Sequence, residues 1–176
     1  YISQSKRPVR YVVSTPFIDF YCFSFPLRTV DMARDANGNL IGVTPEEMTE
    51  DGTFCRWMRR QIENRDSGKF IVAMFGFPPY SGCSTFAPGF AALRWAFHKY
   101  GVHAVVCNGR AYERYTYNNV LYLNVGTGSR NALLESPGDN GLAVPGMLEI
   151  TASPNVLTFD FLDENRISRD TSILTL

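Results

Sequence analysis

The chain of 176 residues has the length of a single domain, and its 45% hydrophobic and 14% aromatic content predicts a packed core rather than disorder. Its 17 basic and 17 acidic residues balance, which argues against a broad surface for nucleic acid or anionic membrane. No run of about 18 apolar residues occurs, so we expect no membrane-spanning helix. Because the chain begins at Tyr1 without a methionine, we expect a processed or truncated piece.

The first third of the chain predicts two strands followed by a helical segment. Aromatic and β-branched residues bounded by prolines predict strands over Arg10–Ser14 and Phe17–Phe25. Thr44-Pro45-Glu46-Glu47 combines an N-cap, a proline at the first helical position and a capping-box glutamate, so a helix is predicted to begin there. Helical spacing of apolar residues continues to Ile62, with Asp51-Gly52 as a point of interruption.

The middle third predicts a strand, a loop, a helix and a second strand. Phe70–Phe75 is a short apolar run typical of a buried strand. Pro78 to Gly82 predicts a rigid loop, since neither proline can extend a strand ladder. Apolar spacing over Phe90–Tyr100 predicts a helix that Gly101 terminates, and Val102–Cys107 predicts the next strand.

The remainder of the chain is predicted to be mostly β. A hairpin is expected around Asn118-Asn119. Three further strands are expected between 147 and 174, with turns at 153–155 and 163–165. Strands and helices alternate first and strands dominate later. We therefore expect one α/β domain over 1–176, with a mixed sheet, flanking helices and an antiparallel C-terminal meander.

Two segments carry a family resemblance. They read KFIVAMFGFPPYSG (69–82) and LRWAFHKYGVHAVVCNGRAYERY (93–115). Their order resembles the calcineurin-like metallophosphoesterase superfamily, most closely its purple-acid-phosphatase-like branch. There a strand ends in a histidine before a Pro-Pro-Tyr loop, and a Gly-His-x-His turn later runs into "NYER". The resemblance implies that this chain corresponds to the C-terminal half of an α/β/β/α sandwich.

The resemblance also implies that the metal ligands are replaced. The three histidine positions of the family hold Gly76, Asn108 and Arg110. Glycine offers no donor atom, an amide oxygen is a weak ligand for zinc, iron or manganese, and a guanidinium repels a cation. The ligand motifs of the family's first half do not occur. Of the two histidines, His98 is read as a partly exposed helix residue and His103 is kept as a candidate site residue. No metal and no other cofactor is expected.

Arg110 supports a sharper hypothesis. A guanidinium in place of two metal ions could receive a phosphate or sulfate group in a bidentate fashion. Asn108, Tyr112, Tyr80 and the 76–80 loop would surround that group, with His103 as a further candidate. The alternative is that Arg110 is a solvated or salt-bridged turn residue. Next to it, Glu113-Arg114 is read as an internal ion pair that holds the turn.

We therefore expect a catalytically inactive domain with a structural role in an oligomeric assembly. Half of a sandwich leaves an apolar sheet face uncovered, and such a face marks an interface. A second copy or a companion chain would cover it, in an extracellular, cell-surface or viral particle rather than in the cytoplasm. The alternatives are one part of a split metal-dependent phosphoesterase, or a phosphate- or sulfate-binding module that uses Arg110.

Overall fold

A seven-stranded mixed sheet forms the centre of the computed structural model, which describes residues 9–24, 45–65, 68–83, 89–126, 134–135 and 138–176. Its strands run in the order β1-β2-β3-β4-β6-β5-β7. They are β1 (Val9–Ser14), β2 (Ile18–Ser24), β3 (Phe70–Phe75), β4 (Ala104–Gly109), β6 (Val120–Gly126), β5 (Tyr112–Tyr117) and β7 (Asn140–Leu142). The central β2, β3, β4 and β6 are parallel, and β1, β5 and β7 run antiparallel to their neighbours. The predicted mixed sheet is confirmed.

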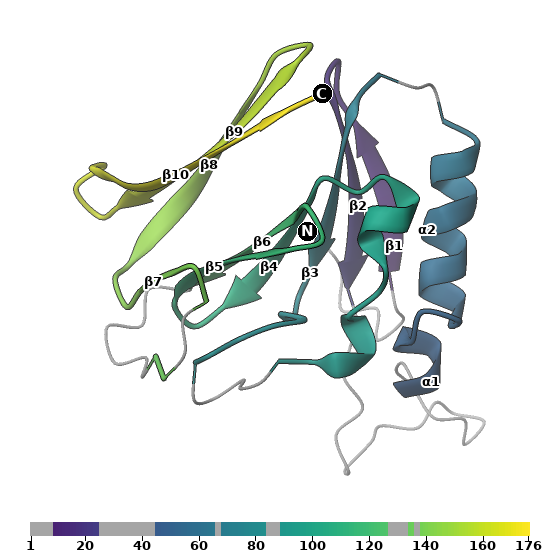
Figure 1. The fold of residues 1–176 in the computed structure, drawn as a ribbon, viewed down its shortest axis with the longest axis horizontal. Helices are drawn as coiled ribbons and strands as arrows, with labels where there is room; N and C mark the ends of the chain where they lie inside the picture. Colours follow the sequence, from purple (N-terminus) through teal and green to yellow (C-terminus); the bar gives the residue numbers. More distant parts are fainter. Residues whose placement is uncertain (1–8, 25–44, 66–67, 84–88, 127–133, 136–137) are drawn as a thin grey trace, which may run out of the picture.

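A second, three-stranded antiparallel sheet ends the chain. It comprises β8 (Gly146–Ala152), β9 (Val156–Asp163) and β10 (Ser168–Thr175) in the order β10-β9-β8. Figure 1 shows this sheet on one side of the larger sheet and the helices on the other. The predicted meander and both of its turns are confirmed, because apolar and polar residues alternate along β9 with the period of a strand.

Two helices lie on the far side of the larger sheet. They are α1 (Pro45–Met48) and α2 (Thr53–Glu63). The predicted interruption is confirmed: a Cβ at Gly52 would lie 2.1 Å from the Glu47 carbonyl oxygen, so this close turn requires glycine. Phe54, Cys55 and Met58 of α2 are buried against the sheet. None of the helices in the described residues is long and apolar enough to cross a membrane.

The helix predicted over 90–100 is wrong. Two short 3₁₀ turns stand there, η1 (Ala91–Leu93) and η2 (Phe97–Tyr100). Between them the backbone of Arg94 and Ala96 leaves the helical region, with ψ of 60° and 57°. This break turns both Trp95 and Phe97 into the core, where the Trp95 indole N–H donates to the Met48 carbonyl at 2.7 Å. Burial of two large rings thus overrides the helical spacing.

The predicted hairpin is confirmed between β5 and β6. Asn118 and Asn119 have φ angles of 49° and 61°. A two-residue turn with positive φ at both positions matches the twist of its flanking strands, and asparagine tolerates that conformation better than most residues do.

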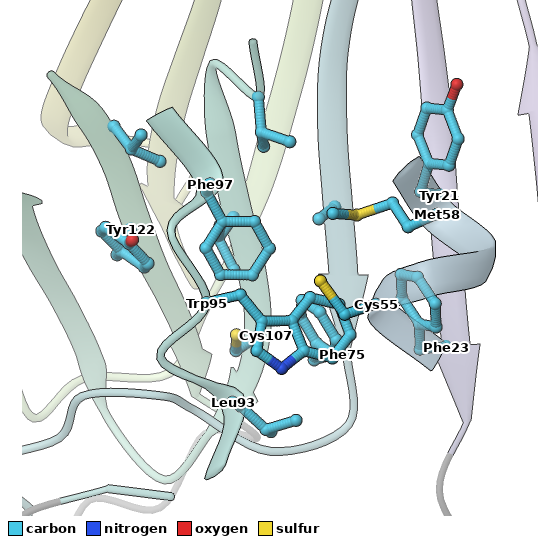
Figure 2. Close-up of a cluster of buried hydrophobic side chains, with 14 of the residues drawn as sticks. Tyr21, Phe23, Cys55, Met58, Phe75, Leu93, Trp95, Phe97, Cys107 and Tyr122 are labelled. Atoms are coloured by element: carbon cyan, nitrogen blue, oxygen red, sulfur yellow. The ribbon is translucent and has the colours of Figure 1, made fainter. Parts of the chain in front are cut away.

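The core is divided between the two faces of the larger sheet. On the helix side, aromatic and sulfur-containing side chains form one cluster (Figure 2). Its largest members include Tyr21, Phe23, Met58, Phe75, Trp95, Phe97 and Tyr122. On the opposite side, a second cluster lies between the two sheets and includes Phe70, Tyr112, Leu123, Leu157, Phe159 and Phe161. All four cysteines are free thiols.

Candidate interaction site between the two sheets

Two of the three positions that the resemblance aligns with metal-binding histidines, Gly76 and Asn108, lie on the same face of the larger sheet and at the same edge. Val72 and Met74 of β3 pack into the inter-sheet cluster, as do Ala104 and Val106 of β4. Phe75 is the register partner of Cys107, so the residues that follow, Gly76 and Asn108, are neighbours. Both are exposed, at the carboxyl ends of the parallel strands.

An apolar groove of about 480 Å³ begins at this edge and runs between the sheets. Most of its lining comes from the carboxyl ends of β3, β4 and β6 and from the start of β8. The side chains include Met74, Val106, Val125, Met147, Leu148 and Ile150. Among the described residues of the lining, Asn108 is the only amide-bearing side chain and none is charged. The groove is therefore suited to apolar side chains rather than to a charged group.

The groove exists because the smaller sheet stops at β8. On β9, the inward residues Leu157, Phe159 and Phe161 are at most 1% exposed. On β8, the equivalent residues Leu148 and Ile150 are only half-buried. β8 pairs with β9 on one side, and no other described strand pairs with its outer edge. Such an edge is a template for a further strand.

The larger sheet has a matching open strip. Tyr11 and Val13 of β1 pair with Cys22 and Phe20 of β2, on the face that points toward the smaller sheet. Tyr11 is 41% exposed and Val13 is 45% exposed. The sheet face expected to be bare is thus covered over β4, β6 and β5 and remains partly open over β1 and β2.

Arg110 and Tyr112 have different environments although they are two residues apart. Arg110 is exposed in the turn between β4 and β5. Tyr112 is buried, stacks on Phe161 with ring centroids 4.2 Å apart, and donates its hydroxyl to Asp170 at 2.6 Å. Burial and this hydrogen bond raise the pKa of Tyr112. Its hydroxyl is therefore engaged within the core.

Tyr80 and His103 lie away from Asn108. Tyr80 packs on the helix-side face, its ring centroid 4.3 Å from that of Tyr117, with the Arg94 guanidinium 4.6 Å above it. His103 lies at the amino end of β4, where its Nδ1 accepts the Ile71 N–H at 2.9 Å. Burial lowers the pKa of His103. The five candidate residues are therefore not brought together: Asn108 and Arg110 lie near the carboxyl edge, and Tyr112, Tyr80 and His103 lie elsewhere.

A buried carboxylate that the sequence analysis assigned differently fixes the loop beside this edge. Glu113 is 0% exposed. Its Oε1 accepts the Gly82 N–H at 2.6 Å and the Tyr115 hydroxyl at 2.7 Å, and its Oε2 accepts Ser81 Oγ at 2.8 Å and Asn124 Nδ2 at 3.0 Å. Four donors replace the solvation that burial removes. Glu113 therefore anchors the loop that follows Pro78-Pro79 to β5.

Glu113 and Arg114 are not an ion pair with each other. Successive side chains on a strand point to opposite faces, so Arg114 points toward the smaller sheet and pairs with Asp170 at 3.0 Å. The sequence signal that could have separated them is the period of two along β5, where buried Tyr112 and half-buried Arg114 share one face and Glu113 and Tyr115 share the other.

A dinuclear metal centre does not fit the residues at this edge. Gly76 has no donor and Arg110 is cationic, so Asn108 alone offers an oxygen. No group of three or more His, Cys, Asp or Glu side chains able to hold a metal occurs among the described residues. Packing does not enforce the glycine, because a Cβ at Gly76 would meet no heavy atom within 4 Å.

A scan against models of protein families found no match, and a search of curated proteins found no significant match.

Proposed function

We propose that this chain is a catalytically inactive metallophosphoesterase-like domain that acts as an interaction module in an oligomeric assembly. Support for the family comes from the order of its sequence segments and from the mixed sheet, in which Gly76 and Asn108 end neighbouring parallel strands. Support for inactivity comes from the side chains at those positions, which offer one amide where metal catalysis needs several donors.

The observation that carries the interaction role is the contrast between β9 and β8. Both strands direct alternate apolar residues toward the larger sheet, yet those of β9 are sealed and those of β8 are half-exposed. The groove, the unpaired edge of β8 and the open strip on β1 and β2 border the same gap between the sheets. A partner that adds an extended strand to β8 would satisfy the backbone edge and bury the apolar lining together. That partner is a second copy of this chain or a companion chain.

Charge substitution in the groove tests this proposal. Met147 borders the groove at the start of β8 and is 54% exposed, so we expect Met147→Glu to leave the fold of the single chain intact while placing a charge at the rim of the interface. Ile173→Glu is the matched control, because Ile173 is 63% exposed on β10 at the other edge of the smaller sheet.

The mass of the assembly and its bound metal are measured by native mass spectrometry and sedimentation velocity, on protein purified without chelators. We expect a metal-free assembly for the wild type and for Ile173→Glu, and dissociation of Met147→Glu. A wild type that remains monomeric at cellular concentration would contradict the interaction role. A robust metal-dependent hydrolysis of an aryl phosphate by the pure chain would contradict the proposed inactivity.

A further inference from the structure

A polar cavity of about 300 Å³ lies at the other end of the sheet, far from Gly76 and Asn108. Its lining comes from the turn between β1 and β2, the end of α2 and the start of β3. These three segments lie along the upper edge of Figure 1. Its lining residues are Val12, Ser14, Asp19, Tyr21, Gln61, Asn64, Arg65 and Lys69. The proposed interaction role makes no use of this cavity.

Among the described residues that line the cavity, positive charge exceeds negative charge. Within that set Arg65 and Lys69 face one carboxylate, that of Asp19, whose side chain is 8% exposed. Arg65 NH1 lies 3.4 Å from Asp19 Oδ2, and Lys69 Nζ lies 3.6 Å from Asp19 Oδ1. Close charge-assisted pairs are nearer 2.7–2.9 Å, so neither cation is tightly bound to Asp19. Lys69 instead donates to Ser14 Oγ at 2.8 Å, and Ser14 donates to Asp19 at 2.6 Å.

The second observation is a tyrosine hydroxyl at the wall of the cavity. Tyr21 is 1% exposed, and its ring packs in the helix-side core beside Trp57. Figure 2 shows the Tyr21 hydroxyl at the outer end of the ring, directed away from the packed side chains. Tyr21 lines the cavity, so its hydroxyl is within reach of a ligand held there. A hydroxyl that opens into a cavity can donate to the oxygen of such a ligand.

We propose that this cavity is a binding site for a small oxyanion of the phosphate or sulfate type, free or carried on a small ligand. The Tyr21 hydroxyl donates to the anion, and Lys69 and Arg65 supply the charge. Asp19 offsets one of these two positive charges, so one remains in excess among the described residues of the lining. Burial raises the pKa of Tyr21, so the hydroxyl keeps its proton at neutral pH and remains a donor.

The decisive variant is Tyr21→Phe, because it removes the hydroxyl and keeps the ring. The probe is inorganic phosphate, titrated by calorimetry and by thermal denaturation at an ionic strength held constant with chloride. A hydrogen bond to a charged group predicts binding about tenfold weaker in Tyr21→Phe. Lys69→Gln removes one of the two cations, and we expect it to weaken binding further.

Two controls separate this site from other effects. Tyr117→Phe makes the same chemical change at an exposed tyrosine of the β5–β6 hairpin, and we expect wild-type binding. Arg110→Ala tests the other anion hypothesis, and we again expect wild-type binding. Phosphate binding that persists in Tyr21→Phe, or that is lost in Arg110→Ala, would overturn the proposal, as would equal stabilisation by chloride alone.

Comparing the affinities for inorganic phosphate and phenyl phosphate shows whether the cavity prefers a free ion or a phosphorylated small molecule. Tighter binding of the ester, lost in Tyr21→Phe, assigns the cavity to a phosphorylated small molecule. Tighter binding of the free ion, lost in the same variant, assigns it to phosphate itself. Failure of both probes to bind the wild type would refute the site and leave the inter-sheet interaction untouched, because the two regions share no residue.

Discussion

The two faces of the seven-stranded sheet are built from similar strands but are covered to different extents. On the helix side, α2 and the turns η1 and η2 seal a cluster in which Phe97, Cys55 and Met58 have no exposed surface. On the other side, the smaller sheet seals the region beneath β9 and leaves a groove beneath β8. The comparison teaches that what covers a strand, rather than its apolar content, decides whether its side chains stabilise the single chain or are available to a partner.

The largest expected effect is on the sealed face. Phe97→Ala removes a ring that is 0% exposed and contacts Phe75 and Trp95, so we expect a loss of about 3–5 kcal/mol in the free energy of unfolding. Urea denaturation followed by fluorescence measures it. A loss below about 1 kcal/mol would show that this face is not sealed in solution.

The next effect concerns the carboxylate beneath the Pro78–Gly82 loop. Glu113→Gln places an amide N–H₂ among four donors and leaves at least one of them unpaired, which should cost about 2 kcal/mol. Hydrogen exchange at Gly82 should also accelerate. Glu149→Gln, at an exposed position on β8, is the control and should change stability little. Equal effects of the two substitutions would contradict the anchoring role.

A smaller effect in the single chain is expected in the groove. Ile150→Ala truncates a half-buried side chain, so we expect about 1 kcal/mol of destabilisation in the isolated chain. Because a partner would bury the rest of that side chain, the assembly should weaken by more than the chain does. Sedimentation equilibrium beside urea denaturation separates the two quantities. Thr151→Ala, on the outward face of β8, should alter neither.

The smallest expected effect is a pH dependence from His103. Burial, and then the charge of Arg65, hold its pKa in the folded chain below the ordinary value of 6.5. The unfolded chain therefore takes up the proton first, and stability falls as pH drops from about 6.5 toward the lower folded pKa. Denaturation midpoints across this window should decline, and His103→Gln should flatten that decline. If the midpoints of His103→Gln decline with pH as steeply as those of the wild type, another group causes the pH dependence.

Local chemistry explains which elements could be predicted from the sequence. Phe70–Phe75 is a strand with the predicted bounds because a short, continuously apolar run suits a strand buried on both faces. The Asn118-Asn119 turn and the break at Gly52 were predictable for a similar reason, since positive φ and a close backbone approach restrict the residues allowed there. Over 90–100 the same approach failed, because two rings had to reach the core from adjacent turns.

The candidate site was less predictable than the fold. Asn108 and Gly76 are neighbours, as expected for the ends of parallel strands. Tyr80 and Tyr112 lie on opposite faces of the larger sheet. His103 lies at the amino end of β4, and Asn108 lies near the carboxyl end of the same strand. Proximity in sequence to a motif says little about which face or end a side chain occupies, because each strand residue alternates in direction.

The sequence by itself determined the α/β class, the alternation along the strands, the turns and the poor suitability of Gly76, Asn108 and Arg110 as metal ligands, because each depends on residue type and local spacing. Only the tertiary structure decided that Glu113 is buried among four donors, that the smaller sheet covers the larger one only as far as β8, and that Tyr21 lines a cavity together with Arg65 and Lys69. Those features depend on segments far apart in the chain meeting in space, and no local pattern encodes where such segments meet.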